Sequence, residues 1–262
     1  MEFIVTPEQR EALTHVGYKF TAGGSHSSRT LMLTELKAVL DAVPMGTDPE
    51  SYRSAVVKRN VLRKGTESTR QKSIRHLREL YALSETVPVF FVLRRLYTAD
   101  PQGLPLLALL SAWGRDPLFR ATTPAVLTVP VGAEVHTRTL AQAVAQAFPD
   151  QYSELNQNKI ARNAASSWTQ SGHLSGRTRK VRHRVQPTAG AVAMALWLSD
   201  LAGFHGLSTF TSPWCRLLDL GADQARTRAM EAHRHGLLSM RAIGEIVELT
   251  FPGFPATEHV SP

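Results

Sequence analysis

The sequence contains no acidic residue between Leu155 and Ser199, although this stretch is rich in lysine and arginine. Within it lies a basic run that holds Arg177, Arg179, Lys180, Arg182 and Arg184. A group of cations without carboxylates in the surrounding sequence is typical of a site that binds a polyanion such as nucleic acid. A solvated, charged hairpin is the alternative interpretation of the same run.

Cysteine and long apolar runs are scarce as well. Cys215 is the only cysteine, so no internal disulfide is expected, and its neighbours Trp214 and Leu217 predict that it is buried. No apolar run approaches the ~20 residues of a spanning helix. The N-terminus has an acid at its second position and no apolar core, unlike a signal peptide. These features predict a cytoplasmic protein without a membrane partner.

Sequence patterns of catalysis are also missing. The chain has no Walker-type glycine loop, no GxGxxG, no HExxH and no GxSxG. His233 and His235 are two residues apart on a predicted helix and therefore point in different directions, which makes a poor metal pair. We expect no catalytic residue, no metal and no cofactor.

Apolar residues recur at helical spacing along most of the 262 residues, and the net charge of +8 favours an acidic partner. This pattern predicts a mainly α fold with small β-wings, in two helical lobes of helix-turn-helix or winged-helix character. Pro130 and Gly132 interrupt the pattern. The expected organisation is an N-terminal arm at 1–27, a helical lobe at 28–130, a winged-helix-like lobe at 131–254 and a disordered tail at 255–262. The arm is expected to hold a short helix from Pro7 to about His15, followed by a linker that ends in the flexible, polar stretch TAGGSHSSR.

Local signals define several elements. Ser28 is predicted to open a helix that ends at Pro44, and Asp48 to cap the next one, with Pro49 in its first turn. Ser68 with Gln71 fits a capping box. Further predictions are a helix at 222–236 and a hairpin at 236–251 that turns around Gly244.

The segment 153–172 is predicted to be a helix with a polar face beside a buried one. The buried side is expected to hold Leu155, Ile160, Ala161, Ala164, Ala165 and Trp168. The polar residues predicted to contact DNA are Asn158, Lys159, Arg162 and Ser166. Asparagine can bond to adenine and arginine to guanine in the major groove, and a basic hairpin behind such a helix would grip phosphates as a wing. An ordinary solvated helix face is the alternative.

A second basic block covers residues 51–80, with nine basic and two acidic residues and a net charge of +7. Its pattern of a helix, a turn with Gly65 and another helix resembles a helix-turn-helix. Arg70, Lys72 and Arg75, near the start of the later helix, are the predicted contacts with DNA. Exposed helices are often basic, so a purely structural pair of helices is the alternative.

Three segments, NVLRKGTESTRQKSIRHLRELYAL (60–83), LLALLSAWGRDPLF (106–119) and KIARNAASSWTQSGHL (159–174), occur in an order that resembles the BrxA family. These are accessory proteins of BREX phage-defence systems. The resemblance covers about residues 28–200, and the N-terminal arm and the C-terminal helix and hairpin depart from it. It implies two mainly helical lobes, binding of double-stranded DNA, no known catalytic residues and other defence-system proteins as partners.

Together these observations predict a non-catalytic, double-stranded DNA-binding accessory protein of a bacterial antiphage defence system. Two alternatives remain open. One is a winged-helix transcriptional regulator, which would show a specific high-affinity promoter site. The other is a scaffold whose basic face binds an acidic protein or RNA, which would show no binding to duplex DNA.

Overall fold

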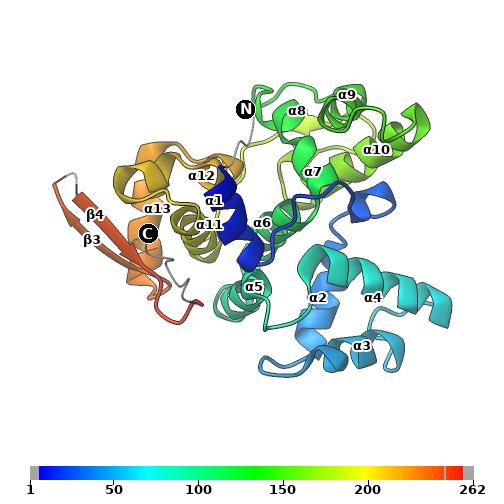
Figure 1. Ribbon diagram of the computed structural model, residues 1–262, viewed down its shortest axis with the longest axis horizontal. Helices are drawn as coiled ribbons and strands as arrows, with labels where there is room; N and C mark the ends of the chain where they lie inside the picture. Colours follow the sequence, from blue (N-terminus) through cyan, green and yellow to red (C-terminus); the bar gives the residue numbers. More distant parts are fainter. Residues whose placement is uncertain (1–5, 245, 256–262) are drawn as a thin grey trace.

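A computed structural model describes residues 6–244 and 246–255 (Figure 1). Helices make up most of the first half of the chain: α1 (Pro7–His15), the 3-10 turn η1 (Ser25–Ser27), α2 (Leu33–Ala42), α3 (Pro49–Val57), α4 (Glu67–Tyr81), α5 (Pro88–Ala99), η2 (Pro101–Gly103), α6 (Leu104–Arg115), α7 (Pro117–Ala121) and α8 (Thr123–Leu127).

The second half adds two short antiparallel hairpins to further helices. Its elements are α9 (Thr137–Ala147), α10 (Glu154–Gln170), β1 (Leu174–Ser175), β2 (Val181–Arg182), α11 (Ala189–Leu201), η3 (Gly206–Thr211), α12 (Pro213–Leu217), α13 (Ala222–Arg234), β3 (Ser239–Ile243) and β4 (Ile246–Thr250). The prediction of a mainly helical chain with small β-hairpins is confirmed.

The helix starts follow from capping residues. The Asp48 side chain accepts a hydrogen bond from the Ser51 N–H at 2.9 Å, with Pro49 in the first turn, as predicted. The predicted cap of α4 was wrong, because Thr66 and not Ser68 accepts the bond from the Thr69 N–H. The predicted start at Ser28 was also wrong, since α2 begins only at Leu33.

The centre of the molecule is formed by α6 and α11, which are apolar on nearly every side. Nearly every residue of both helices is buried, as expected for a helix that is hydrophobic all round. In Figure 1 they lie in the middle of the molecule. Helix α1 lies in front of α11, and α12 and α13 lie beside α11. Trp113 of α6 meets Trp214 of α12 edge to face, with ring centroids 6.4 Å apart.

One hydrophobic cluster runs through both predicted lobes. It includes Leu36 and Leu77 from the range 28–130 together with Trp168, Leu196 and Ala229 from the range 131–254. Residues on both sides of Pro130 therefore share one core, and experiments on this protein should use the whole chain.

The β1–β2 hairpin (residues 174–182) is extended by a third segment of chain. Val135 N–H donates to the Lys180 carbonyl at 2.8 Å, and Arg182 N–H donates to the Ala133 carbonyl at 2.9 Å. Glu134 pairs with Val181 in an antiparallel bridge. The segment 133–135, just before α9, thus lines the edge of β2 that β1 leaves open.

The second hairpin, β3–β4, projects at the left of Figure 1. Its five residue pairs run from Ser239 with Thr250 to Ile243 with Ile246, and Gly244 adopts a φ of +60° in the turn. This pairing confirms the predicted hairpin around Gly244. Glycine suits the turn because it takes this left-handed conformation without a steric penalty.

None of the helices within the described residues is long and apolar enough to cross a bilayer. The tail 255–262 was predicted to be disordered. Residues 256–262 of this tail lie outside the described part of the chain.

Candidate nucleic-acid interface

Helix α10 presents a polar surface next to a buried apolar one. Ser153 caps its N-terminus, and the buried side holds Ile160, Ala161, Ala164, Ala165, Ser167 and Trp168. Among the predicted contacts with DNA, Lys159 and Arg162 are exposed, whereas Asn158 and Ser166 are half-buried. The Ser166 hydroxyl donates to the Arg162 carbonyl at 3.0 Å within the helix. The structure therefore leaves this predicted stripe on the surface.

Leu155 belongs to this surface and not to the core. The prediction that it lies on the buried side was wrong, because 77% of Leu155 is exposed. It sits on the first turn of α10, where no other described element covers the side of the helix it shares with Arg162. We call Leu155, Asn158, Lys159, Arg162 and Ser166 the α10 stripe.

The β1–β2 hairpin lies against the C-terminal half of α10. Lys180 joins the two, since its ammonium donates to Thr169 Oγ1 at 3.0 Å and to the Gly176 carbonyl at 2.7 Å. Gly176 has a φ of +88°, and a Cβ there would lie 2.1 Å from the Arg179 carbonyl oxygen, so the turn requires glycine. Arg177, Arg179 and Arg184 are exposed around this hairpin.

Arg182 was predicted to contact phosphates, but the structure places its side chain in the interior. Only 2% of it is exposed, and its guanidinium forms an ion pair with both carboxylate oxygens of Asp219 and bonds to the His183 carbonyl. Asp219 also accepts a bond from the Val185 N–H at 3.0 Å. Arg182 therefore anchors the base of the hairpin, and it cannot reach a duplex without breaking a buried ion pair.

A carboxylate from elsewhere in the chain reaches the hairpin as well. Arg179 Nε lies 2.8 Å from Glu134 Oε2, with 74% of the Arg179 side chain exposed. An exposed pair of this kind contributes little to stability and leaves the guanidinium accessible to solvent. The stretch 155–199 contains no acidic residue, yet folding brings Glu134 to the surface that this stretch forms.

The second predicted surface lies on α4. Lys72 and Arg75 are exposed and Arg70 is half-buried. A surface depression between α3 and α4 is lined by Arg53, Ser68, Gln71, Lys72, Ile74, Arg75 and Arg78. Four of these seven residues are basic and none is acidic, so the depression has the electrostatic character of a polyanion site.

Residues 17–31, which we call the strap, connect α4 to α10. The short helix predicted from Pro7 to His15 is confirmed as α1, but the prediction that the following stretch TAGGSHSSR is flexible was wrong at Ser25 and His26, because both are fully buried. Ser25 Oγ contacts Glu79 and His76 of α4. The His26 carbonyl accepts a bond from Asn163 Nδ2 of α10 at 2.8 Å.

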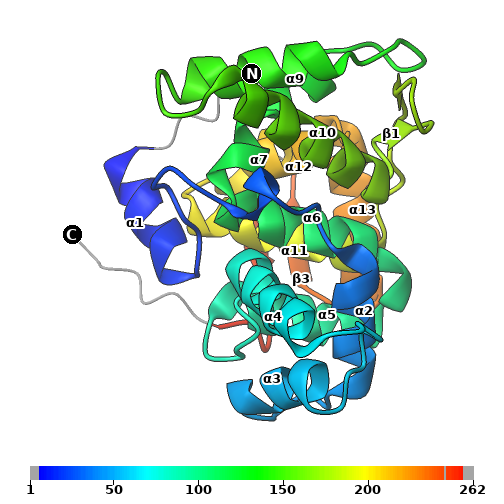
Figure 2. The same cartoon turned by 90° about the vertical axis from the view of Figure 1, so that its right-hand side faces the viewer.

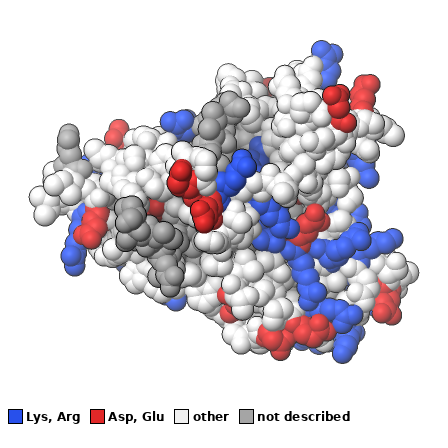
Figure 3. Space-filling model, viewed as in Figure 1, with Lys and Arg blue, Asp and Glu red and all other residues white. Residues whose placement is uncertain are grey.

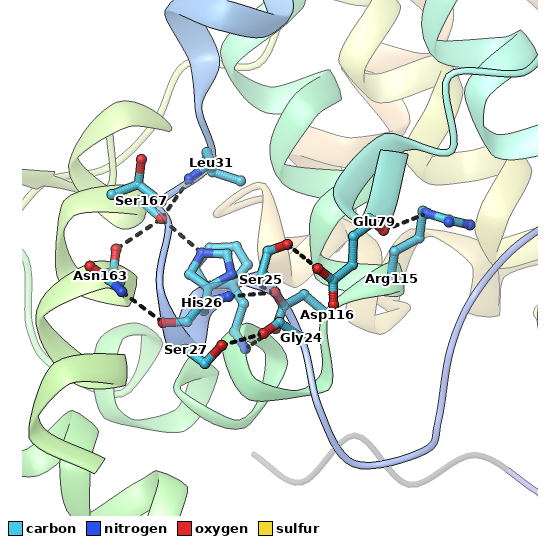
Figure 4. A network of polar contacts seen from close by, with 12 residues as sticks. Gly24, Ser25, His26, Ser27, Leu31, Glu79, Arg115, Asp116, Asn163 and Ser167 are labelled. Atoms are coloured by element: carbon cyan, nitrogen blue, oxygen red, sulfur yellow. Dashed lines mark hydrogen bonds and ion pairs between the residues drawn. The ribbon is translucent and has the colours of Figure 1, made fainter. Parts of the chain in front are cut away.

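His26, at the centre of the strap, is hydrogen-bonded in the interior to Asp116 and to Ser167 of α10 (Figure 4). His26 Nδ1 lies 2.8 Å from Asp116 Oδ2, and His26 Nε2 lies 2.8 Å from Ser167 Oγ. Asp116 also accepts bonds from the His26 N–H at 3.0 Å and from the Phe119 N–H at 3.0 Å, which caps α7. The imidazole stacks on Phe119 with 4.4 Å between ring centroids.

Serine, histidine and aspartate occur here in the order of a hydrolase triad, but each of them is hydrogen-bonded within the core. All three are completely buried. Ser167 Oγ accepts a bond from the Leu31 N–H and donates one to the Asn163 carbonyl, both at 2.9 Å. A hydroxyl occupied in this way, with no exposed surface, cannot meet a substrate while the strap is in place.

Strap, α10 stripe and hairpin follow one another across a single side of the molecule. Asn163 and Gln170 on one flank of the stripe bind the strap, and Thr169 on the other flank binds Lys180. Figure 2 looks onto this side and shows α10 near the centre, β1 to its right and α4 below it. The helices α10 and α4 and the β1–β2 hairpin are thus all in view from this side.

Positive charge continues onto the neighbouring face. In Figure 3, Lys and Arg gather on the right-hand half of the view, on the side of α4, and are sparser on the left, around the β3–β4 hairpin. Lys19 of the strap is exposed as well. In this view the cations are concentrated toward the side of α4, with several acidic residues among them.

His173 lies beneath the hairpin and should make the fold sensitive to acid. Its Nε2 donates to the Leu217 carbonyl at 2.9 Å, and burial lowers the pKa of His173 to about 4, although the nearby Asp219 opposes this shift. The unfolded chain would take up a proton near pH 6.5, which the folded chain accepts only near pH 4. Stability is therefore complete above pH 6.5 and is lost as the pH falls toward 4, by up to about 3 kcal/mol.

Urea unfolding at pH 7.5 and at pH 5 measures this loss. In the variant His173→Gln the side chain has no proton to gain, so the variant should be less stable at pH 7.5 but should lose less on acidification. An equal loss between the two pH values in both proteins would assign the acid sensitivity to other groups.

No group of His, Cys, Asp and Glu within residues 6–244 and 246–255 is arranged to hold a metal ion. A scan against protein-family models finds no match to the chain, and a search of curated proteins finds none either. These comparisons therefore assign no family to the chain.

Proposed function

We propose that the chain binds double-stranded DNA, with α10 in or beside the major groove and the β1–β2 hairpin on the phosphates. The observation that carries this proposal is the position of the α10 stripe. It is a solvent-facing row with Lys159 and Arg162, flanked by a basic hairpin that Lys180 ties to the same helix. A helix with such a row can read base edges while the hairpin holds the backbone.

The order of elements supports the same proposal. A winged helix consists of a helix, a strand, two further helices and a two-stranded wing, and its first strand pairs with its last. Here α8 is followed by the segment 133–135, by α9 and α10, and by β1 and β2. The segment 133–135 bonds to β2, which is the pairing that a winged helix requires.

The biological role that we propose is that of a non-catalytic accessory protein in a phage-defence system. It rests on the resemblance of residues 28–200 to the BrxA family, whose members serve in BREX operons. The buried, fully bonded state of Ser167, His26 and Asp116 agrees with a chain that acts by binding. Other proteins of such a system are the expected partners besides DNA.

A titration of the whole chain with a random duplex and with a duplex from its own upstream region, at several salt concentrations, tests this function. Neutralised phosphates release counterions, so log Kd should vary linearly with log salt, with a slope of about 0.9 per phosphate neutralised. Similar affinity for both duplexes would support the accessory role. Much tighter binding of the upstream duplex would favour a regulator, and no binding at low salt would overturn the proposal in favour of a scaffold.

A further inference from the structure

We infer that Leu155 contacts thymine methyl groups in the major groove, so that the chain prefers duplexes that carry a methyl group at this position. The inference rests on the proposed function and adds a chemical preference to it. It starts from an exposed apolar side chain at the N-terminal end of the α10 stripe, whose other members are polar or basic.

Leu155 is the exception among the apolar residues of α10. Ile160, Ala161 and Trp168 are completely buried, whereas 77% of Leu155 is exposed. The large apolar residues that precede the helix, Phe148 and Tyr152, are packed against a small cluster around Val144. Leu155 thus adds nothing to the core, and its side chain is free to be buried by a ligand.

The position of Leu155 is that of a base-contacting residue. Arg162 and Ser166 follow it after seven and eleven residues, which correspond to about two and about three helical turns, so all three lie on one face. Recognition helices meet base edges mainly with their N-terminal residues, and Leu155 occupies the second position of α10. Glu154, the acid beside it, points about a quarter of a turn away.

The chemistry of this side chain selects its partner on the DNA. Leucine has no hydrogen-bonding group, so it gains nothing from phosphates or from the polar base edges. The C5-methyl group of thymine is the one apolar group that the four bases present in the major groove. Contact between the two removes apolar surface from water, while Lys159 and Arg162 beside it supply the attraction to the backbone.

Duplexes that differ only in methyl groups test this inference. We would measure the affinity of the whole chain for an alternating A·T duplex and for the same duplex with deoxyuridine in place of thymidine. The second pair would be a G·C duplex with cytosine or with 5-methylcytosine, which carries its methyl group at the same place in the groove. Wild type should bind the methylated member of each pair more tightly, by about fourfold for each methyl group buried by Leu155.

Leu155→Ala should bind the methylated and unmethylated duplexes equally well, with an unchanged affinity for the unmethylated ones. Leu207→Ala is the matched control, since Leu207 is an exposed leucine on η3, and it should keep the wild-type preference. Equal binding of both duplexes by wild type, or an undiminished preference in Leu155→Ala, would overturn the role of Leu155 while DNA binding stands. Failure to bind any duplex would overturn both proposals.

Discussion

Replacement of Asp116 by alanine should lower the free energy of unfolding by about 3–5 kcal/mol. Its buried carboxylate accepts bonds from the His26 N–H, from His26 Nδ1 and from the Phe119 N–H. Burial opposes ionisation, yet the charge and the hydrogen bonds of His26 keep the pKa of Asp116 below its usual value. The substitution would leave these donors without partners in the core and would detach the strap from α7 and α10.

Asp48→Ala provides a matched control for this loss. Asp48 and Asp116 both cap a helix and both precede a proline in its first turn, but Asp48 is more exposed and caps α3 without the buried histidine that Asp116 binds. Loss of such a cap should lower stability by only about 1 kcal/mol. Urea unfolding of both variants separates the contribution of the cap from that of the strap. If both variants were destabilised equally, the interaction with His26 would contribute nothing measurable.

The second large effect should appear in DNA binding. The triple variant Arg162→Ala, Arg177→Ala, Arg179→Ala should bind a duplex on the order of 10²-fold more weakly at about 0.1 M salt, if each side chain neutralises one phosphate. The log–log salt slope should become shallower by about one for each phosphate that is no longer neutralised. Fold stability should hardly change, because the three side chains are exposed.

Arg182 is left out of this variant because its replacement would break a buried ion pair and confuse unfolding with binding. The control is a second triple variant with the same change in charge on α13 and β3, namely Arg226→Ala, Arg234→Ala, Arg241→Ala. It should keep the wild-type affinity and slope, since none of the three residues belongs to the α10 stripe, the β1–β2 hairpin or α4. Equal weakening by both variants would mean that net charge alone, and not the proposed interface, governs binding.

The elements of the candidate interface were largely predictable from local sequence. Ser153 caps α10, apolar residues recur along it up to Trp168, and Gly172, with a φ of +88°, follows its last turn. Such signals act within one or two turns, so they survive in any tertiary context. The wrong assignment of Leu155 was avoidable from the sequence, because helical spacing places it with Arg162 and Ser166, on the face opposite Ala164.

The strap could not be predicted in the same way. Its sequence of glycines, serines and a histidine is typical of a flexible linker, and no local pattern indicates a partner. Its order comes from Asp116 and Ser167, which are 90 and 141 residues away from His26. The role of Asp116 as a helix cap was recognisable from the sequence, because it precedes a proline as Asp48 does.

The sequence by itself determined the helical class, the two hairpins and the basic character of the chain, because periodicity, capping and composition act locally. Only the tertiary structure decided which cations are accessible. Asp219 and Glu134 lie outside the stretch without acids, yet folding places the first against Arg182 in the interior and the second against Arg179 at the surface. Charge acts through space and not along the chain, so the electrostatic surface depends on interactions between residues that are far apart in the sequence.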